Sequence, residues 1–259
     1  MNKAIIFLSL LSAGAIAAPR HEVNVGFSDL KDQNDNFIGV QYRHYLQELD
    51  ADNSAWLIAP YLQRVSSVSG QYFTVNNTHL YNLGATWYAD SQWMVSADVT
   101  YVDYDENLGD RDDKALDVKV GYNVNRQWQF GAGAFYQRDE VSYTTFDGQV
   151  DYSDNEVSPG IFARYTQLDN GQGWDVGAEV TVGDRESLEL SSRYFFSPRV
   201  SAGATYTHVN GSRGTDQDVL ELDVDYWFAN GFSLRAGLGV ELGDNDGLGS
   251  ATLLATYRF

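Results

Sequence analysis

Charged side chains recur two residues apart within segments that are otherwise apolar. Asp117 and Lys119 are spaced in this way, and so are Glu221 and Asp223. A spacing of two places both side chains on the same face of a β-strand. Acidic and basic groups aligned on one face can bind ions and orient polar solutes, and this chemistry breaks no covalent bond.

Residues for covalent or metal chemistry are scarce. The sequence contains no cysteine, which excludes a disulfide framework, a thiolate nucleophile and cysteine-based metal sites. The four histidines, at positions 21, 44, 79 and 208, form no close pair in the sequence, so we predict no zinc site. The segment 244–247 (DNDG) matches part of a calcium loop but lacks the later ligands. We therefore expect neither a metal ion nor a cofactor.

The charge balance is strongly acidic. Asp and Glu number 36 against 17 Lys and Arg, which gives a formal net charge of −19. A nucleic-acid-binding protein usually presents a basic surface, so we predict no nucleic-acid partner. The chain is also rich in Tyr and Gly, which is atypical of a cytosolic enzyme.

The first residues have the features of a secretory signal peptide. Lys3 supplies a positive charge, a short apolar run follows, and Ala15-Ile16-Ala17 fits a small-x-small cleavage site. The alternative is a membrane anchor, but the run is shorter than the roughly 20 residues that a helix needs to span lipid. We predict a signal peptide over residues 1–17 and a single domain over residues 18–259.

Alternation of apolar with polar or small residues recurs along the rest of the chain. This period of two is typical of β-strands whose faces meet different environments. One segment, residues 56–65, is ambiguous because it contains Pro60 and is apolar on both faces, so twelve strands remain an alternative to fourteen. The predicted strands are residues 22–28, 37–47, 56–65, 79–89, 93–103, 115–124, 128–137, 156–166, 174–183, 187–196, 200–209, 218–228, 232–241 and 249–259.

The connections and the aromatic residues indicate how these strands are arranged. Short connections alternate with longer polar ones, of which residues 138–156 are the longest. Aromatic residues such as Trp93, Trp128 and Trp174 begin strands next to short connections, as expected at a lipid–water boundary. The pattern predicts an all-β fold, a transmembrane antiparallel up-and-down β-barrel with short periplasmic turns and long extracellular loops. Both termini would then be periplasmic.

The signal peptide, the alternating strands and the ending Tyr257-Arg258-Phe259 together resemble Gram-negative outer-membrane β-barrel proteins. More narrowly, the chain resembles the compact general porins of these bacteria. The resemblance implies that Tyr257 and Phe259 form an assembly signal for the barrel-assembly machinery. It also implies an integral position in the outer membrane, with membrane lipids and lipopolysaccharide as partners.

The predicted function is that of a porin, a water-filled channel for passive diffusion of small hydrophilic solutes or ions. Fourteen strands approach the size at which barrels leave an aqueous channel. Because acidic residues outnumber basic ones, we expect a weak preference for cations. The charges could form a field across the bore or could neutralise one another in neighbouring pairs, and residues 138–156 could narrow the pore or lie across its mouth. The predicted pore-lining residues are Arg43, Asp98, Asp117, Lys119, Arg164, Glu179, Glu189, Arg193, Glu221, Asp223 and Arg235.

Two other classes of function remain open. The barrel could be closed and serve a structural or adhesive role through its loops. It could also be an outer-membrane lipid hydrolase, since residues 207–214 faintly resemble the His-x-Ser-Asn segment of that group. However, position 210 is Asn, so a strand would carry no nucleophile beside His208, and we predict no enzyme. Both a monomer and a homo-oligomer are compatible with the sequence.

Overall fold

The structure is a computed structural model that describes residues 18–30, 36–50, 54–106, 109–145, 148–211, 216–242 and 247–259. The predicted signal peptide over residues 1–17 lies outside the described residues, and so does most of the acidic segment 244–247.

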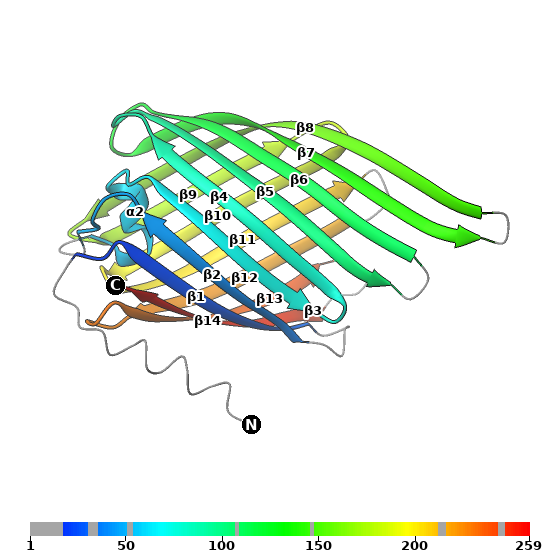
Figure 1. The fold of residues 1–259 in the computed structure, drawn as a ribbon. Coiled ribbons are helices and arrows are strands. Elements are labelled where there is room, and N and C mark those ends of the chain that lie inside the picture. Colours follow the sequence, from blue (N-terminus) through cyan, green and yellow to red (C-terminus); the bar gives the residue numbers. More distant parts are fainter. Residues whose placement is uncertain are drawn as a thin grey trace, which may run out of the picture.

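Fourteen antiparallel strands form one closed barrel, in which each strand pairs with its neighbours in the sequence and β1 pairs with β14 (Figure 1). The predicted fold class is therefore confirmed. Closure leaves the wall of the barrel with no open sheet edge, as a sheet surrounded by lipid requires. The strands are β1 (His21–Leu30), β2 (Asn36–Tyr45), β3 (Ser67–Val75), β4 (Thr78–Tyr88), β5 (Trp93–Glu106), β6 (Gly109–Asn123), β7 (Trp128–Thr145), β8 (Gly148–Asp169), β9 (Gln172–Thr181), β10 (Arg185–Ser197), β11 (Val200–Gly211), β12 (Asp216–Trp227), β13 (Phe232–Leu242) and β14 (Gly247–Arg258).

The distribution of apolar and polar side chains is the reverse of that in a soluble protein. Leu83 and Ile161 are 69% and 67% exposed, whereas Asp225 and Glu22 are only 3% and 5% exposed. Along β9 the exposed residues alternate strictly with less exposed ones, as the period of two predicts. The apolar face therefore points outward around the barrel, and the polar face points into it.

The strand predicted over residues 56–65 is wrong. Trp56–Ile58 form a 3-10 helix, η1, and Ala59–Leu62 form a short α-helix, α2, while the third strand follows later as β3. Pro60 explains the difference, because proline lacks the N–H that a strand ladder needs but fits the first turn of a helix. No helix among the described residues is long and apolar enough to cross a bilayer.

Several segments predicted as long polar loops are continuations of strands. Residues 138–156 belong mostly to β7 and β8, which pair from Trp128↔Tyr165 out to Thr145↔Gly148. The ladder of β5 and β6 likewise extends to Glu106↔Gly109. Figure 1 shows the β7–β8 hairpin projecting beyond the barrel at the end opposite the C-terminus. We call this the far end, and the end where β1 begins and β14 finishes the terminal end.

Candidate functional site: the barrel interior

An ion pair crosses two strands on the inner face of the wall. Nζ of Lys119, on β6, lies 2.6 Å from a carboxylate oxygen of Glu179 on β9, and 3.5 Å from Oδ2 of Asp117. The intervening strands β7 and β8 present Gly133 and Gly160 at this level. A Cβ on Gly133 would lie 2.9 Å from Cγ of Lys119, so this glycine leaves the space through which the lysine side chain passes.

A second group of charges is organised in the same way. Arg193 on β10 bonds to Asp223 on β12 across β11, where a Cβ on Gly203 would lie 2.6 Å from Nη2 of the arginine. Nε of Arg235 lies 3.8 Å from Asp223 and 3.5 Å from Asp225. In both groups, acids and bases neutralise one another in local pairs. The structure therefore favours local pairing over two separated, oppositely charged walls.

Arg164 joins the wall to the helical segment. Its Nε and Nη2 atoms both donate to the carboxylate of Asp175 on β9, each at 2.8 Å. The guanidinium carbon also lies 3.5 Å from the centroid of the Tyr61 ring on α2, which is a close cation–π contact. The wall thus positions an aromatic side chain of α2 inside the terminal end.

Three of the predicted acids form no ion pair among the described residues. They are Asp98 on β5, Glu189 on β10 and Glu221 on β12. The remaining predicted residue, Arg43, lines a cavity of about 340 Å³ together with Glu22 and Arg258. The described wall therefore carries a surplus of negative charge beyond its paired groups.

The seam between β1 and β14 contains a buried ion pair. Nε of Arg258 donates to Oε2 of Glu22 at 2.6 Å, and the two side chains are only 7% and 6% exposed. Arg258 also donates to the carbonyl oxygen of Trp56 at 2.5 Å and stacks over the ring of Trp227 at 4.3 Å. The last inward-facing residue of the barrel therefore holds both the first strand and the helical segment.

Tyr257 and Phe259 lie on either side of Arg258, at the outer rim. Their rings stack at 5.5 Å, and Phe259 is 43% exposed. The backbone N–H of Phe259 donates to the carbonyl of His21, and the N–H of His21 donates to the carbonyl of Phe259, both at 2.9 Å. The strand ladder thus continues to the last residue.

The described parts of the connection between β2 and β3, residues 46–50 and 54–66, lie across the terminal end. The N–H of Trp56 donates to the carbonyl of Pro198 in the β10–β11 turn at 2.8 Å, and its ring packs against Trp227 of β12 at 5.6 Å. Tyr61 reaches Arg164 on β8. We call residues 46–50 and 54–66 the plug. Figure 1 shows α2 at the end of the barrel that carries the C-terminus. Two features of residues 56–65 could have indicated the plug in the sequence: Pro60, and apolar residues on both faces of the supposed strand.

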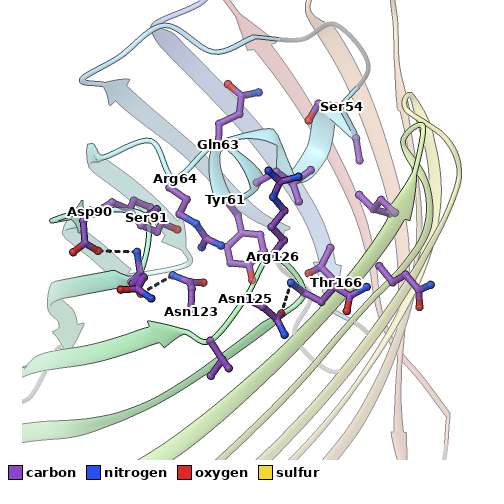
Figure 2. Close-up of a pocket in the computed structure, with 18 of the residues that line it drawn as sticks. Ser54, Tyr61, Gln63, Arg64, Asp90, Ser91, Asn123, Asn125, Arg126 and Thr166 are labelled. Atoms are coloured by element: carbon purple, nitrogen blue, oxygen red, sulfur yellow. Dashed lines mark hydrogen bonds between the residues drawn. The ribbon is translucent and has the colours of Figure 1, made fainter.

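A cavity of about 1160 Å³ remains at the terminal end, between the plug and the turns that join β4–β5, β6–β7 and β8–β9. Figure 2 shows side chains from the plug and from these turns around it. Those that concern us below are Tyr61, Arg64, Asn123, Arg126 and Thr166. The sequence predictions named none of these five as site residues. Tyr61 and Arg64 belonged to the false strand at 56–65, Asn123 and Thr166 to the ends of the predicted strands 115–124 and 156–166, and Arg126 to a short connection.

The histidines have structural partners. Nδ1 of His208 lies 2.9 Å from Oδ1 of Asp218, which also accepts a hydrogen bond from Tyr206 at 2.5 Å. No described Ser or Thr hydroxyl bonds to His208, and Ser212 lies outside the described residues. His21 and His44 are far apart in the sequence, but strand pairing places them side by side, with their Nδ1 atoms 3.3 Å apart.

Metal binding has no support in the described part of the chain. Within those ranges, no group of three or more His, Cys, Asp or Glu side chains is arranged to hold an ion.

Comparison with known proteins identifies the fold. No family model matches the chain, and no curated protein matches it in sequence. Among solved structures, the chain is similar to the outer membrane protein Omp33 of Acinetobacter baumannii, with a TM-score of 0.68 and 16% identity over 93% of this chain and 98% of that one. It is also similar to the monoaromatic hydrocarbon channel CymD, with a TM-score of 0.53 and 9% identity over 98% and 92% of the two chains.

The chain therefore has the fold of the outer-membrane β-barrels, as the ending of the sequence and its alternation predicted. At these identities the likeness concerns the fold alone.

Proposed function

We propose that the protein is a porin-like channel through which small hydrophilic solutes or ions diffuse passively. The observation that supports this most strongly is the division of the closed barrel into an apolar exterior and a charged interior. Such a wall is stable when lipid surrounds it and water fills it. The wall performs no bond chemistry, and its paired charges set the size and polarity of the path.

We further propose that the barrel is integral to the outer membrane with its terminal end facing the periplasm. Its apolar belt contacts lipids, and lipopolysaccharide surrounds the far end. Tyr257 and Phe259 support a role as an assembly signal for the barrel-assembly machinery, because both are presented at the outer rim of the last strand. Cleavage of residues 1–17 is part of the same proposal.

The plug sets the narrowest part of the path in this mechanism. Trp56 holds it near β10, β12 and β14, Tyr61 reaches β8, and the cavity of about 1160 Å³ lies between the plug and the turns that join β4–β5, β6–β7 and β8–β9. Solutes pass through this cavity and along the inner wall. Asp98, Glu189 and Glu221 form no ion pair among the described residues, so they give the wall its weak preference for cations.

Planar-bilayer recordings of the refolded protein test both parts of the proposal. We expect stepwise currents, and a reversal potential in a KCl gradient that indicates K⁺ preference. Replacing all three acids, by Asp98→Asn, Glu189→Gln and Glu221→Gln, should move the reversal potential toward zero. A matched control is Glu186→Gln, which removes one acid from the outward face of β10 and should leave the potential unchanged.

A membrane that shows no current would contradict the channel and favour a closed structural barrel. The plug supplies a second test. Tyr61→Ala removes the ring that packs 3.5 Å from Arg164, while Asp175 still holds the arginine. Single-channel conductance should therefore rise. An unchanged conductance would mean that the plug does not limit flow.

A further inference from the structure

The large cavity at the terminal end is basic, although the chain as a whole carries a net charge of −19. Two arginines, Arg64 from the plug and Arg126 from the β6–β7 turn, line it, and Asp90 is the single acid among the described residues that line it. The carboxylate of Asp90 is already engaged, since Oδ1 accepts the backbone N–H groups of Gln92 at 2.7 Å and Trp93 at 2.8 Å. The cavity therefore presents positive charge to whatever enters it.

Arg64 is held in an unusual conformation. Its φ angle is 54°, in the left-handed region that few residues other than glycine, asparagine and aspartate adopt readily. Such strain persists where surrounding structure enforces it, and it is common at binding sites. Here it occurs at the end of the helical part of the plug, where the N–H of Arg64 donates to the carbonyl of Tyr61 at 3.1 Å.

Two polar atoms at the cavity lack a partner. Nη1 of Arg64, a donor, and Oδ1 of Asn123, an acceptor, are both shielded from solvent and form no hydrogen bond with any described residue. Buried donors and acceptors are nearly always satisfied, because an unsatisfied one loses its hydration without compensation. A ligand in the cavity would satisfy both if the two side chains turn toward it, by supplying an acceptor to the arginine and a donor to the amide oxygen. Figure 2 shows Arg64, Arg126 and Asn123 around the same space.

We propose that this cavity is a binding site for a small organic anion that also carries hydroxyl groups. A carboxylate or phosphate group binds Arg64 and Arg126, for which the planar guanidinium is well suited. A ligand hydroxyl donates to Oδ1 of Asn123. Tyr61 and Thr166 contribute a ring face and a further polar group to the lining. The cavity of about 1160 Å³ holds such a ligand together with water.

This inference goes beyond the proposed channel and does not depend on it. A closed barrel would offer the same cavity at its terminal end, so binding can be measured on protein that conducts no current. Failure of one proposal therefore leaves the other standing.

Isothermal titration calorimetry on the refolded barrel in detergent micelles tests the site. The probes are gluconate, which carries a carboxylate and hydroxyls, inorganic phosphate, and glucitol, the uncharged counterpart of gluconate. We expect saturable binding of gluconate, of phosphate or of both, and none of glucitol. Binding of gluconate alone identifies a carboxylate site, and binding of phosphate alone identifies a phosphate site. No saturable binding of either anion, or equal binding of glucitol, would overturn the proposal.

The decisive variant is Arg64→Asn, because asparagine tolerates the left-handed backbone while removing the guanidinium. We expect the affinity for the anion to fall about tenfold or more, the loss typical of a charge-assisted hydrogen bond. The control is Arg138→Gln, which removes the same charge from the far end and should bind like the unmodified protein. Retained heat-modifiable migration in gels would show that Arg64→Asn still folds. Unchanged affinity in this folded variant would refute the assignment.

Discussion

The buried pair Glu22–Arg258 at the barrel seam makes a quantitative prediction about stability. Replacing Arg258 by Met leaves the carboxylate of Glu22 buried, and among the described residues Asn24 at 3.0 Å and Tyr45 at 2.9 Å are the donors that remain. The side chains of the pair are only 6% and 7% exposed, so water solvates the carboxylate far less than it would at the surface, even with the cavity of about 340 Å³ beside it. Removing one partner of a buried pair costs about 3–5 kcal/mol. We expect Arg258→Met to lower the free energy of unfolding by that amount.

A second substitution should recover part of the loss. In Glu22→Gln combined with Arg258→Met, no charge remains buried, and the Gln carbonyl still accepts from Tyr45. The double variant should therefore be more stable than Arg258→Met alone, which is a strong positive coupling between the two positions. If the two residues were independent, their costs would add and the double variant would be less stable than Arg258→Met. The informative quantity is therefore the sign of the stability change when Glu22→Gln is added to Arg258→Met.

The assay is urea unfolding of the refolded barrel, followed by the β signal in far-ultraviolet circular dichroism. Arg138→Met serves as the control, because its pair with Glu140 is 46% and 33% exposed and should contribute at most about 1 kcal/mol. Two results would refute the reasoning. One is a loss below about 1 kcal/mol for Arg258→Met, and the other is a double variant no more stable than that single one.

Two further predictions concern the terminal end. The first concerns Asp90, whose pKa is held below its ordinary value by the backbone N–H groups of Trp93 and then Gln92. This carboxylate therefore stabilises the turn above about pH 4, and its contribution is lost as the pH falls through the lowered pKa. Asp90→Asn should show a smaller drop in urea midpoint between pH 6 and pH 3 than the unmodified protein, because an asparagine side chain can accept the same two bonds without a charge, as Asn125 does in the β6–β7 turn; an equal drop would argue against this role. Phe259→Ala should reduce several-fold the amount of folded protein recovered from the outer membrane while leaving refolding in detergent unchanged, and a parallel loss in both assays would point to stability instead of recognition during assembly.

The wall of the barrel could be predicted from the sequence because lipid imposes one simple rule on it. Segments such as residues 174–183 alternate without exception, and β9 begins and ends within two residues of that prediction. The same parity places Lys119 and Glu179 on one face. Which of those charges would pair could not be predicted, since the contact passes over Gly133 and Gly160 on strands between them.

The third strand shows where the rule fails. In β3 the inward-facing residue Phe73 is large, and the outward-facing Gly70 and Thr74 are small or polar, so the alternation is hidden. Phe73 fits because it covers Gly39 on β2, where a Cβ would collide with its ring. The large Phe73 is compensated by the small Gly39 on the neighbouring strand, and the sequence of one strand alone does not reveal this match. The predicted total of fourteen was right because the false strand at 56–65 replaced this missed one.

The polar hairpins were missed as strands for a related reason. Beyond the lipid, both faces of a strand meet water, so nothing in the sequence forces alternation there. Asp103 and Asp112 face each other across the β5–β6 ladder although neither segment has an apolar face at that level.

The projecting part of β8 also marks the level of the membrane on this side of the barrel. β8 begins at Gly148, and its ladder with β9 stops at Gly160↔Thr181. Two hydrogen bonds extend the contact, from the Val182 N–H to the Pro159 carbonyl at 2.9 Å and from the Val157 N–H to Asp184 at 3.0 Å, so the edge is open only beyond Val157. Hydrocarbon does not tolerate an open strand edge, so its boundary can lie no farther out than about Val157. The outward-facing residues of β7 between Trp128 and Tyr136 then lie in the span through lipid, and Tyr136 pairs with Val157 at this limit. That span of nine residues matches the 9–11 that a tilted strand needs to cross a bilayer core.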